Sequence, residues 1–271
     1  LLRLMSPTRG SVFFRGQNLA EVGHRDLLEL RQHMQIVFQD PFASLNPNMN
    51  IRQILMEPFE AHGLGTRRER EEWISELAGA VSLDLSLLSR RPVSLSGGQQ
   101  QRVGIARAIA GRPEPVLCDE PVSALDVSVQ AAVLNLLLDI QREMGTPLVF
   151  IAHDLSVVRF FCDAIAVMYL GQVVEEGPAE AIYSPPYHPY TEALLSAVPI
   201  PDPVKTRARA RVHLRGELRG PIDLPSGCRF HPRCTFKMDI CDKEFPPVVE
   251  IEPRHSVACY LYPDKKRHQE E

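Results

Sequence analysis

The pattern of apolar and polar residues predicts several short strands and several amphipathic helices. Short apolar runs bounded by glycine, proline or charge predict strands, and these runs lie at residues 10–16, 34–38, 116–118, 147–152, 165–170 and 173–175. Apolar residues at helical spacing predict helices over residues 67–80, 98–110 and 128–144, and another from about residue 155. The sequence therefore predicts an α/β protein with a largely helical stretch between residues 41 and 112.

Polar side chains follow two of the predicted strands. The order strand, helix, strand over residues 116–152 indicates parallel pairing through a crossover. In such sheets, ligands bind beyond the carboxyl ends of the strands, where Asp119, Glu120 and His153 fall. We expect these side chains at one edge of a sheet. We also expect the strands on either side of Gly171 to complete the same core.

Composition and charge narrow the class of protein. The 271 residues, 44% hydrophobic and 24% charged, suit one large globular domain with an appendage. A formal net charge of -4 argues against nucleic acid as the main partner, because such proteins usually carry a basic excess. No apolar run reaches the roughly 18 residues that span a bilayer. A membrane role would therefore act through partner proteins.

The stretch Leu-Ser-Gly-Gly-Gln at residues 95–99 begins a predicted helix. Small residues and bare backbone N–H groups at a helix N-terminus form an anion site, although Ser-Gly-Gly alone is better explained as a helix cap. The adjacent carboxylates of Asp119 and Glu120 favour the anion site over a simple helix cap. Side chains alternate in direction near a strand end, so one carboxylate can hold Mg²⁺ while its neighbour orients a water, as phosphoryl transfer requires.

Five motifs, in this order along the chain, resemble those of ABC-transporter ATPases. They are Val37-Phe38-Gln39-Asp40-Pro41 (Q-loop), Leu95-Ser96-Gly97-Gly98-Gln99 (signature), Asp119-Glu120-Pro121 (Walker B), Ser123-Ala124-Leu125-Asp126 (D-loop) and Ile151-Ala152-His153-Asp154 (H-loop). Five ordered motifs carry far more weight than one. The resemblance covers residues 10–180 and implies a P-loop NTPase (RecA-like) core with a helical insert, which binds ATP and Mg²⁺.

The resemblance implies roles for four residues in the chain's own nucleotide site. Asp119 resembles the residue that holds Mg²⁺ through water, and Glu120 resembles the general base that orients the attacking water. Gln39 resembles the glutamine that touches Mg²⁺ and water and links the site to the membrane subunit. His153 resembles the residue that contacts the γ-phosphate.

The resemblance also implies a role for the signature residues in a second nucleotide site. Ser96, Gly97 and Gly98 would bind the γ-phosphate of a nucleotide held by the opposite subunit, with Gln99 and Asp126 beside them. Hydrolysis is then expected only in a dimer.

The phosphate-cradling loop G-x-x-x-x-G-K-[ST] does not occur in this sequence, since no Gly is followed by Lys. Leu1-Leu2-Arg3-Leu4 resembles the helix that follows this loop in the family, so we expect a chain truncated just after it. A naturally degenerate subunit is the alternative. In both cases this chain should hold ATP weakly in its own site, because the loop supplies much of the binding.

Two further stretches resemble the ATPases of oligopeptide and dipeptide importers, specifically the second ATPase of the pair. They are residues 30–47 and the segment that starts with His188-Pro189-Tyr190-Thr191. Nickel and other small-solute importers share these features. The resemblance implies a position at the cytoplasmic face of the cell membrane. The implied partners are a second ATPase subunit or a second copy, two transmembrane permease subunits and, indirectly, a solute-binding protein.

The domain boundaries follow from these motifs. We expect residues 1–40 and 113–198 to form the ATPase core, residues 41–112 a helical signature subdomain, and residues 199–271 a C-terminal extension. The extension should begin with a Pro-rich, basic linker that carries Lys205, Arg207, Arg209, Arg211 and Arg215.

The extension contains Cys228, Cys234, Cys241 and Cys259. Four thiolates can ligate tetrahedral zinc or an iron–sulfur cluster. The lack of paired C-x-x-C units argues against zinc. The same pattern in peptide-importer ATPases is associated with a [4Fe–4S] cluster, which the resemblance therefore implies. Zinc or another metal, and unligated or disulfide-linked cysteines, are the alternatives.

Two other classes of protein compete with an importer subunit. An ABC protein of DNA repair or translation would often carry paired ATPase domains or long coiled-coil insertions, and this sequence has neither. A non-hydrolytic partner subunit would suit the missing loop, but it would leave Glu120 and His153 unexplained.

Overall fold

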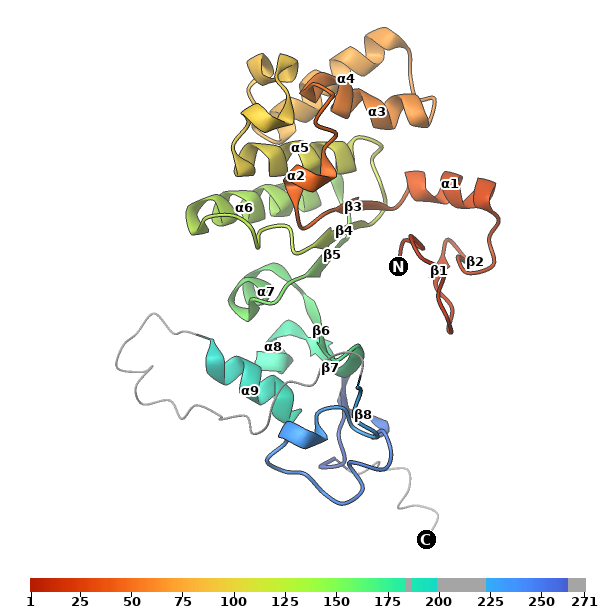
Figure 1. Ribbon diagram of the computed structural model, residues 1–271, viewed down its shortest axis with the longest axis vertical. Coiled ribbons are helices and arrows are strands. Elements are labelled where there is room, and N and C mark those ends of the chain that lie inside the picture. Colours follow the sequence, from red (N-terminus) through yellow and green to blue (C-terminus); the bar gives the residue numbers. More distant parts are fainter. Residues whose placement is uncertain (184–186, 199–222, 263–271) are drawn as a thin grey trace. The chain divides into compact units, whose positions relative to one another are not determined.

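The computed structural model describes residues 1–183, 187–198 and 223–262. The basic stretch predicted as a linker lies outside these residues. The chain divides into two compact units, residues 1–153 and residues 154–271, which are described separately (Figure 1).

Unit 1 begins with a small hairpin and then alternates helices with strands. Its strands are β1 (Phe13–Phe14), β2 (Gln17–Asn18), β3 (Gln35–Val37), β4 (Val116–Asp119) and β5 (Leu148–Ile151). Its α-helices are α1 (His24–Gln32), α2 (Pro41–Ser44), α3 (Ile51–Ala61), α4 (Arg67–Ala80), α5 (Gly97–Ile109) and α6 (Val127–Met144). The predicted helices at 67–80, 98–110 and 128–144 are confirmed to within a residue.

Strands β3, β4 and β5 form a parallel sheet in that order. Helix α6 provides the crossover from β4 to β5, as the sequence predicts, and ends at Gly145, whose φ of 64° suits a left-handed C-terminal cap. Parallel pairing aligns the carboxyl ends of the three strands, with Asp119 opposite Ile151. This edge therefore receives whatever side chains follow the strands.

Local sequence signals fix where three of the helices begin. Helices α3, α4 and α5 each start with a reciprocal capping box, formed by Asn50 with Gln53, Thr66 with Glu69, and Ser96 with Gln99. Each box satisfies two backbone N–H groups that the helix cannot pair itself. Most of α5 is buried, including Gln100, whose side-chain amide donates to the carbonyls of Pro92 and Leu95.

Unit 2 contains an antiparallel sheet and short helices. The helices are α7 (Leu155–Phe161), α8 (Ala179–Tyr183) and α9 (Pro189–Ala197), and the strands are β6 (Ala164–Tyr169), β7 (Gln172–Pro178), β8 (Val248–Glu252) and β9 (His255–Ala258). The strand order is β6-β7-β9-β8. A bilayer-spanning helix, long and apolar enough to cross, is not found among the described residues.

Strands β6 and β7 lie on either side of Gly171, where the sequence predicts two strands. They form an antiparallel hairpin that pairs with β9. Leu170 and Gly171 both have positive φ, which suits the tight turns that reverse a chain between antiparallel strands. The strands β8 and β9 were not predicted from the sequence.

Candidate active site

Three of the predicted site residues meet at one carboxylate oxygen. The Gln39 side-chain amide donates to Oε2 of Glu120 at 2.9 Å, and Nδ1 of His153 lies 3.3 Å from the same oxygen. These residues follow β3, β4 and β5 respectively, so the parallel sheet brings them together. The side chain of Glu120 is 25% exposed and that of His153 is 70% exposed, which leaves the cluster open to a ligand.

The backbone of Glu120 is held in an uncommon conformation. Its φ is 44°, in the left-handed region that residues other than glycine seldom adopt. Its N–H donates to the carbonyl of Ile151 at 3.0 Å, and its own carbonyl accepts from the hydroxyl of Ser123 at 3.0 Å. Strained backbones of this kind occur at active sites, where surrounding structure holds them.

The other two predicted acidic residues flank this cluster along the chain. Asp119 is the last residue of β4, and its half-buried side chain makes no hydrogen bond with another described residue. Asp126 is the exposed N-cap of α6 and makes no side-chain capping bond. Both carboxylates are therefore available to a ligand.

The signature residues lie at the N-terminus of α5, apart from the Glu120 cluster. The hydroxyl of Ser96 accepts from the backbone N–H of Gln99 at 3.4 Å, and the side chain of Gln99 accepts from the N–H of Ser96 at 2.9 Å. Among the described residues, no hydrogen bond links them to Glu120. Gly97 and Gly98 instead face Leu125 and Val129 at the start of α6.

Two residues that support the site were not identified from the sequence. Asp40 caps α2 by accepting from the N–H groups of Phe42 and Ala43 at 2.9 and 3.2 Å. Arg107 in α5 donates to the carbonyl of Ser44 at 2.6 Å, and burial lowers its pKa. An Asp directly before a Pro is a recognisable helix start, so Asp40 could have been found. Arg107 carries no comparable signal.

The four clustered cysteines of unit 2 line one small cavity of about 20 Å³. Burial raises the pKa of Cys259 to about 11, and the neighbouring thiols add to the shift. All six cysteines of the chain are free, so the disulfide-linked alternative is not what the structure has. In the part of the chain that the structure describes, no three His, Cys, Asp or Glu side chains are arranged to hold a metal ion.

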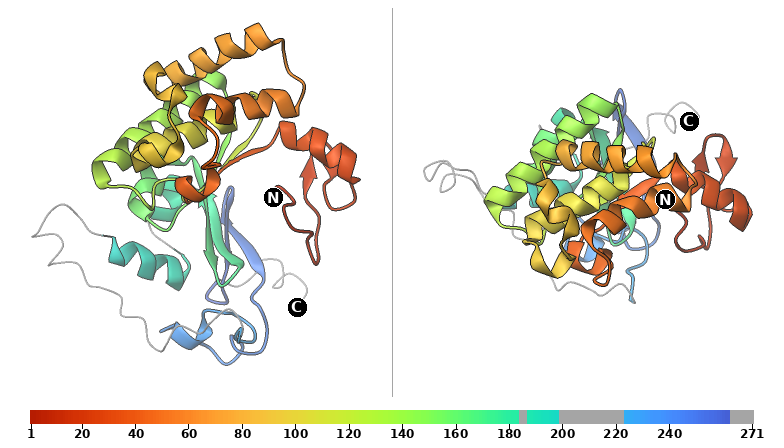
Figure 2. Two further views of the ribbon diagram at one scale, coloured as in Figure 1. Left: turned by 45° about the horizontal axis from the view of Figure 1, so that its top comes forward. Right: turned by 90° about the horizontal axis from the view of Figure 1, so that it is seen from above.

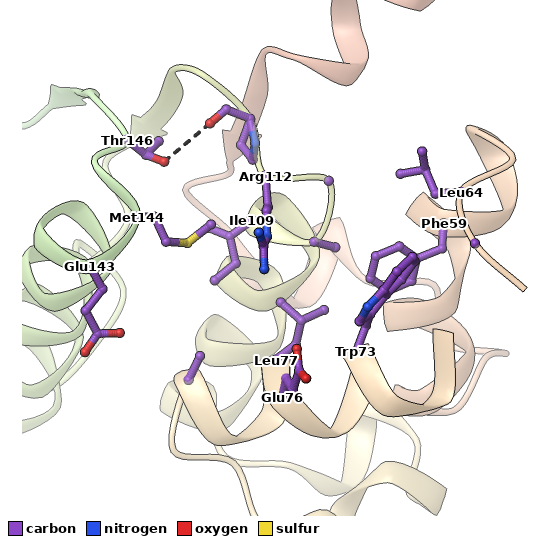
Figure 3. Close-up of a pocket in the computed structure, with 15 residues that line it drawn as sticks. Phe59, Leu64, Trp73, Glu76, Leu77, Ile109, Arg112, Glu143, Met144 and Thr146 are labelled. Carbon is purple, nitrogen blue, oxygen red and sulfur yellow. Dashed lines mark hydrogen bonds between the residues drawn. The ribbon is translucent and has the colours of Figure 1, made fainter. Parts of the chain in front are cut away.

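A separate cavity of about 750 Å³ lies in unit 1 between α3, α4, α5 and α6 (Figure 3). Trp73 and Phe59 form one wall, with ring centroids 5.2 Å apart. On another wall the hydroxyl of Thr146 donates to the carbonyl of Pro113 at 3.3 Å. None of the residues predicted for the nucleotide site lines it.

Comparisons with known proteins identify the family of the chain. Residues 1–123 match the family described as ABC transporter, and residues 174–241 match the one described as oligopeptide/dipeptide transporter, C-terminal region. The probable peptide ABC transporter ATP-binding protein y4tS of Sinorhizobium fredii is 48% identical over 96% of this chain and 73% of its own length. The oligopeptide transport ATP-binding protein AppF of Bacillus subtilis is 47% identical over 97% of this chain and 80% of its own.

Solved structures show the same fold. The ATP-binding cassette MJ0796, as a dimer bound to ADP and Pi, matches with a TM-score of 0.58 and 31% identity, over 65% of this chain and 76% of its own. The protein cbiO1 of Clostridium perfringens matches with a TM-score of 0.60 and 25% identity, over 68% of this chain and 72% of its own. These matches confirm the predicted P-loop NTPase fold of the ABC ATPase type, and the sequence relatives place the chain in the family of ABC-transporter ATP-binding proteins of oligopeptide and dipeptide transporters.

Proposed function

We propose that this protein hydrolyses ATP to energise the import of oligopeptides or dipeptides across the cell membrane. The observation that carries the proposal is the convergence of Gln39 and His153 on the carboxylate of Glu120, at the carboxyl ends of three parallel strands. The likeness to peptide-transporter ATPases supports the choice of solute.

Glu120 would act as the general base. Its Oε2 is engaged by Gln39 and His153, so Oε1 can accept the proton of a water that attacks the γ-phosphate. Carboxylate and amide oxygens are the ligands that Mg²⁺ prefers, so Asp119 and the side chain of Gln39 fit this ion. Mg²⁺, when bound, neutralises the charge that develops on the phosphates.

His153 would connect the base to the phosphate. Its Nδ1 faces Glu120, so Nε2, on the opposite side of the imidazole ring, is free to contact a γ-phosphate oxygen. The contact with Glu120 orients the ring in the same way that carboxylates orient catalytic histidines elsewhere.

The signature residues Ser96, Gly97, Gly98 and Gln99, with Asp126, would serve a nucleotide held by a second ATPase subunit or a second copy. The N-terminus of α5 offers the backbone N–H groups and the positive end of the helix dipole that bind phosphate. The dimeric state of the solved cassette MJ0796 supports this arrangement. Hydrolysis would therefore require two subunits.

The permease partners would meet the helical segment of residues 41–112. Phe42 in α2 is 56% exposed and lies three residues after Gln39. We place this surface against one of two transmembrane permease subunits, at the cytoplasmic face of the membrane. A solute-binding protein would deliver the peptide from the other side. Residues 1–40 and 113–198 would form the ATPase core.

Replacing Glu120 tests the proposed chemistry. In the full-length subunit assembled with its partners, Glu120→Gln should abolish ATP turnover and leave nucleotide-dependent dimers intact, because the base is lost while binding is not. Phosphate release and size-exclusion chromatography with ATP provide the two measurements. Glu72→Gln, on the exposed face of α4, is the control and should hydrolyse ATP normally. Unchanged turnover in Glu120→Gln would remove the role assigned to that residue.

We further propose that Cys228, Cys234, Cys241 and Cys259 hold a [4Fe–4S] cluster. Support comes from the four thiols lining one cavity in unit 2 and from thiolate being the ligand that such clusters require. Binding would have to draw these side chains together, because the described structure does not arrange three of them around one metal position. The raised pKa of Cys259 means that ligation must release a proton. Anaerobic purification followed by iron, sulfide and zinc analysis tests this. Four irons per chain are expected, lost in Cys228→Ser and kept in Cys162→Ser, whereas zinc near one per chain would reject the cluster.

A further inference from the structure

Helices α5 and α6 lie side by side (Figures 1 and 2), and their first turns meet most closely at Gly98 and Val129. A Cβ atom added to Gly98 would lie 2.5 Å from Cγ1 of Val129, and one added to Gly97 would lie 3.4 Å from Cδ2 of Leu125. Non-bonded carbon atoms normally stay about 3.5–4.0 Å apart. Gly98 therefore admits no larger residue while Val129 keeps its place.

Val129 is well suited to act as a fixed surface. It is β-branched, and such side chains have one strongly preferred rotamer in a helix. Leu125 precedes the N-cap of α6, Asp126, and adds a second contact on the same turn, at Gly97. Leu125 is itself anchored, because its carbonyl accepts from the side-chain amide of Gln130 at 2.8 Å.

The contact joins two parts of the site that serve different nucleotides. Leu125 and Val129 lie on either side of Asp126 in the sequence and follow the strand that ends at Glu120. Gly97 and Gly98 belong to the turn that would face the nucleotide of the other subunit. A shift of the start of α6 must therefore shift that turn as well.

We propose that Val129, with Leu125, is a positioning residue that sets the place of the signature turn by direct contact. Gly98 is then required for packing within one chain, in addition to any need for access to phosphate. The signature turn and the start of α6 then move together. This links the segment that follows Glu120 in one subunit to the nucleotide held by its partner. This inference rests on the proposed function.

Gly104 provides a matched comparison in the same helix. It is buried in α5, yet a Cβ added there would meet nothing within 4 Å. Gly104→Ala should therefore be tolerated, since alanine also favours helix over glycine. The contrast between Gly98 and Gly104 separates a packing requirement from the general cost of changing a glycine in α5.

The test is a double-mutant cycle in the full-length subunit, assembled with its partners for the kinetic measurements. Gly98→Ala should lower the Tm by at least about 3 °C and kcat by at least about tenfold, because small displacements at a reacting site are costly. The affinity of the isolated subunit for ATP should change much less, because the turn does not bind the chain's own nucleotide. Gly98→Ala combined with Val129→Ala should recover most of both losses, and Gly104→Ala should show neither.

Conservative changes at Val129 keep the test decisive if Gly98→Ala does not fold. Threonine has nearly the same shape as valine, so Val129→Thr should retain turnover. Val129→Ala removes the methyl groups that contact Gly98 and should lower kcat. The inference is overturned if the double variant is as slow as Gly98→Ala alone, or if Gly98→Ala keeps both Tm and kcat. A wild-type complex without ATP turnover would refute the proposed function, while the Tm cycle would still decide whether the contact exists.

Discussion

At the scale of single residues, Glu120 combines a strained backbone with a crowded carboxylate. Its φ of 44° directs the side chain out of the line of β4, toward Gln39 and His153. A strand residue continuing in extended geometry would instead alternate across the sheet. The Glu120 carboxylate is therefore placed by its backbone as much as by its neighbours.

This strain predicts an unusual order of stability among variants of Glu120. Both Glu120→Asn and Glu120→Val lose the side-chain hydrogen bonds, but Asn tolerates positive φ and Val does not. We expect the free energy of unfolding of Glu120→Val to be about 1–2 kcal/mol lower than that of Glu120→Asn. Trp73, the single tryptophan, reports on unfolding of unit 1 by fluorescence in a urea titration.

The neighbouring strand residue supplies the control for this prediction. Asp119 is the last residue of β4, and its φ is not positive. β-Branched residues are favoured in strands. Asp119→Val should therefore be no less stable than Asp119→Asn. The same order at both positions would show that the backbone of Glu120 stores no strain.

At the scale of elements, the short helix α2 depends on bonds from outside itself. It has four residues, between the Asp40 cap and Leu45, and an isolated helix of that length is unstable in water. The bond from Arg107 in α5 to the carbonyl of Ser44 holds its C-terminus. Through this bond α5, which begins with the signature residues, supports the segment that follows Gln39.

Removing Arg107 should loosen α2 selectively. Arg107→Ala loses a charged hydrogen bond of about 1.5–3 kcal/mol, so amide hydrogen exchange in residues 42–45 should become about tenfold faster or more. Arg102→Ala is the matched control, because Arg102 lies in the same helix and donates to the carbonyl of Val81 at the end of α4. It should speed exchange near residue 81 alone. Equal effects of both variants at α2 would contradict the assigned bond.

At the scale of the whole molecule, the chain forms two units that each close around long-range contacts. In unit 2, the buried carboxylate of Glu175 lies 2.9 Å from Nε2 of His255, which is 80 residues away. It also accepts from the backbone N–H groups of Tyr187 and His188 at 3.1 and 2.9 Å. Strand β9 is thereby fixed to β7 and to the start of α9.

His188 makes the stability of unit 2 depend on pH. Burial lowers its pKa to about 4, although nearby Glu175 opposes the shift. Between about pH 6.5 and 4 the unfolded chain binds a proton that the folded chain does not, so stability is full above pH 6.5 and falls as the pH drops. By pH 4 the folding stability of unit 2 should have fallen by about 3 kcal/mol. Hydrogen exchange in β7 and β9, corrected for intrinsic rates, measures it.

His188→Asn separates this titration from general acid effects. Asn can still cap α9, where Nδ1 of His188 accepts from the N–H of Tyr190 at 3.1 Å, but it does not titrate. The variant should lose less stability than the wild type between pH 7 and 5, and His24→Asn at an exposed position of unit 1 should behave as the wild type. Parallel losses in all three proteins would exclude His188 as the cause.

The sequence by itself determined features that depend on neighbouring residues. The capping boxes at Asn50, Thr66 and Ser96 and the glycine after α6 set helix ends, because these interactions span only a few positions. The ordered motifs also identified the family. Parallel pairing of β4 and β5 followed from the strand, helix, strand order, and it predicted that Glu120 and His153 share one edge.

The tertiary structure decided the contacts between segments that are distant in the sequence. Gln39 meets Glu120 across 81 residues, Gly98 packs on Val129, Arg107 reaches Ser44 across 63, and β7 pairs with β9 of the C-terminal extension. The periodicity of a chain shows which face of an element is buried, but not which distant surface buries it. That choice depends on the shapes and chain connections of all the packed elements at once.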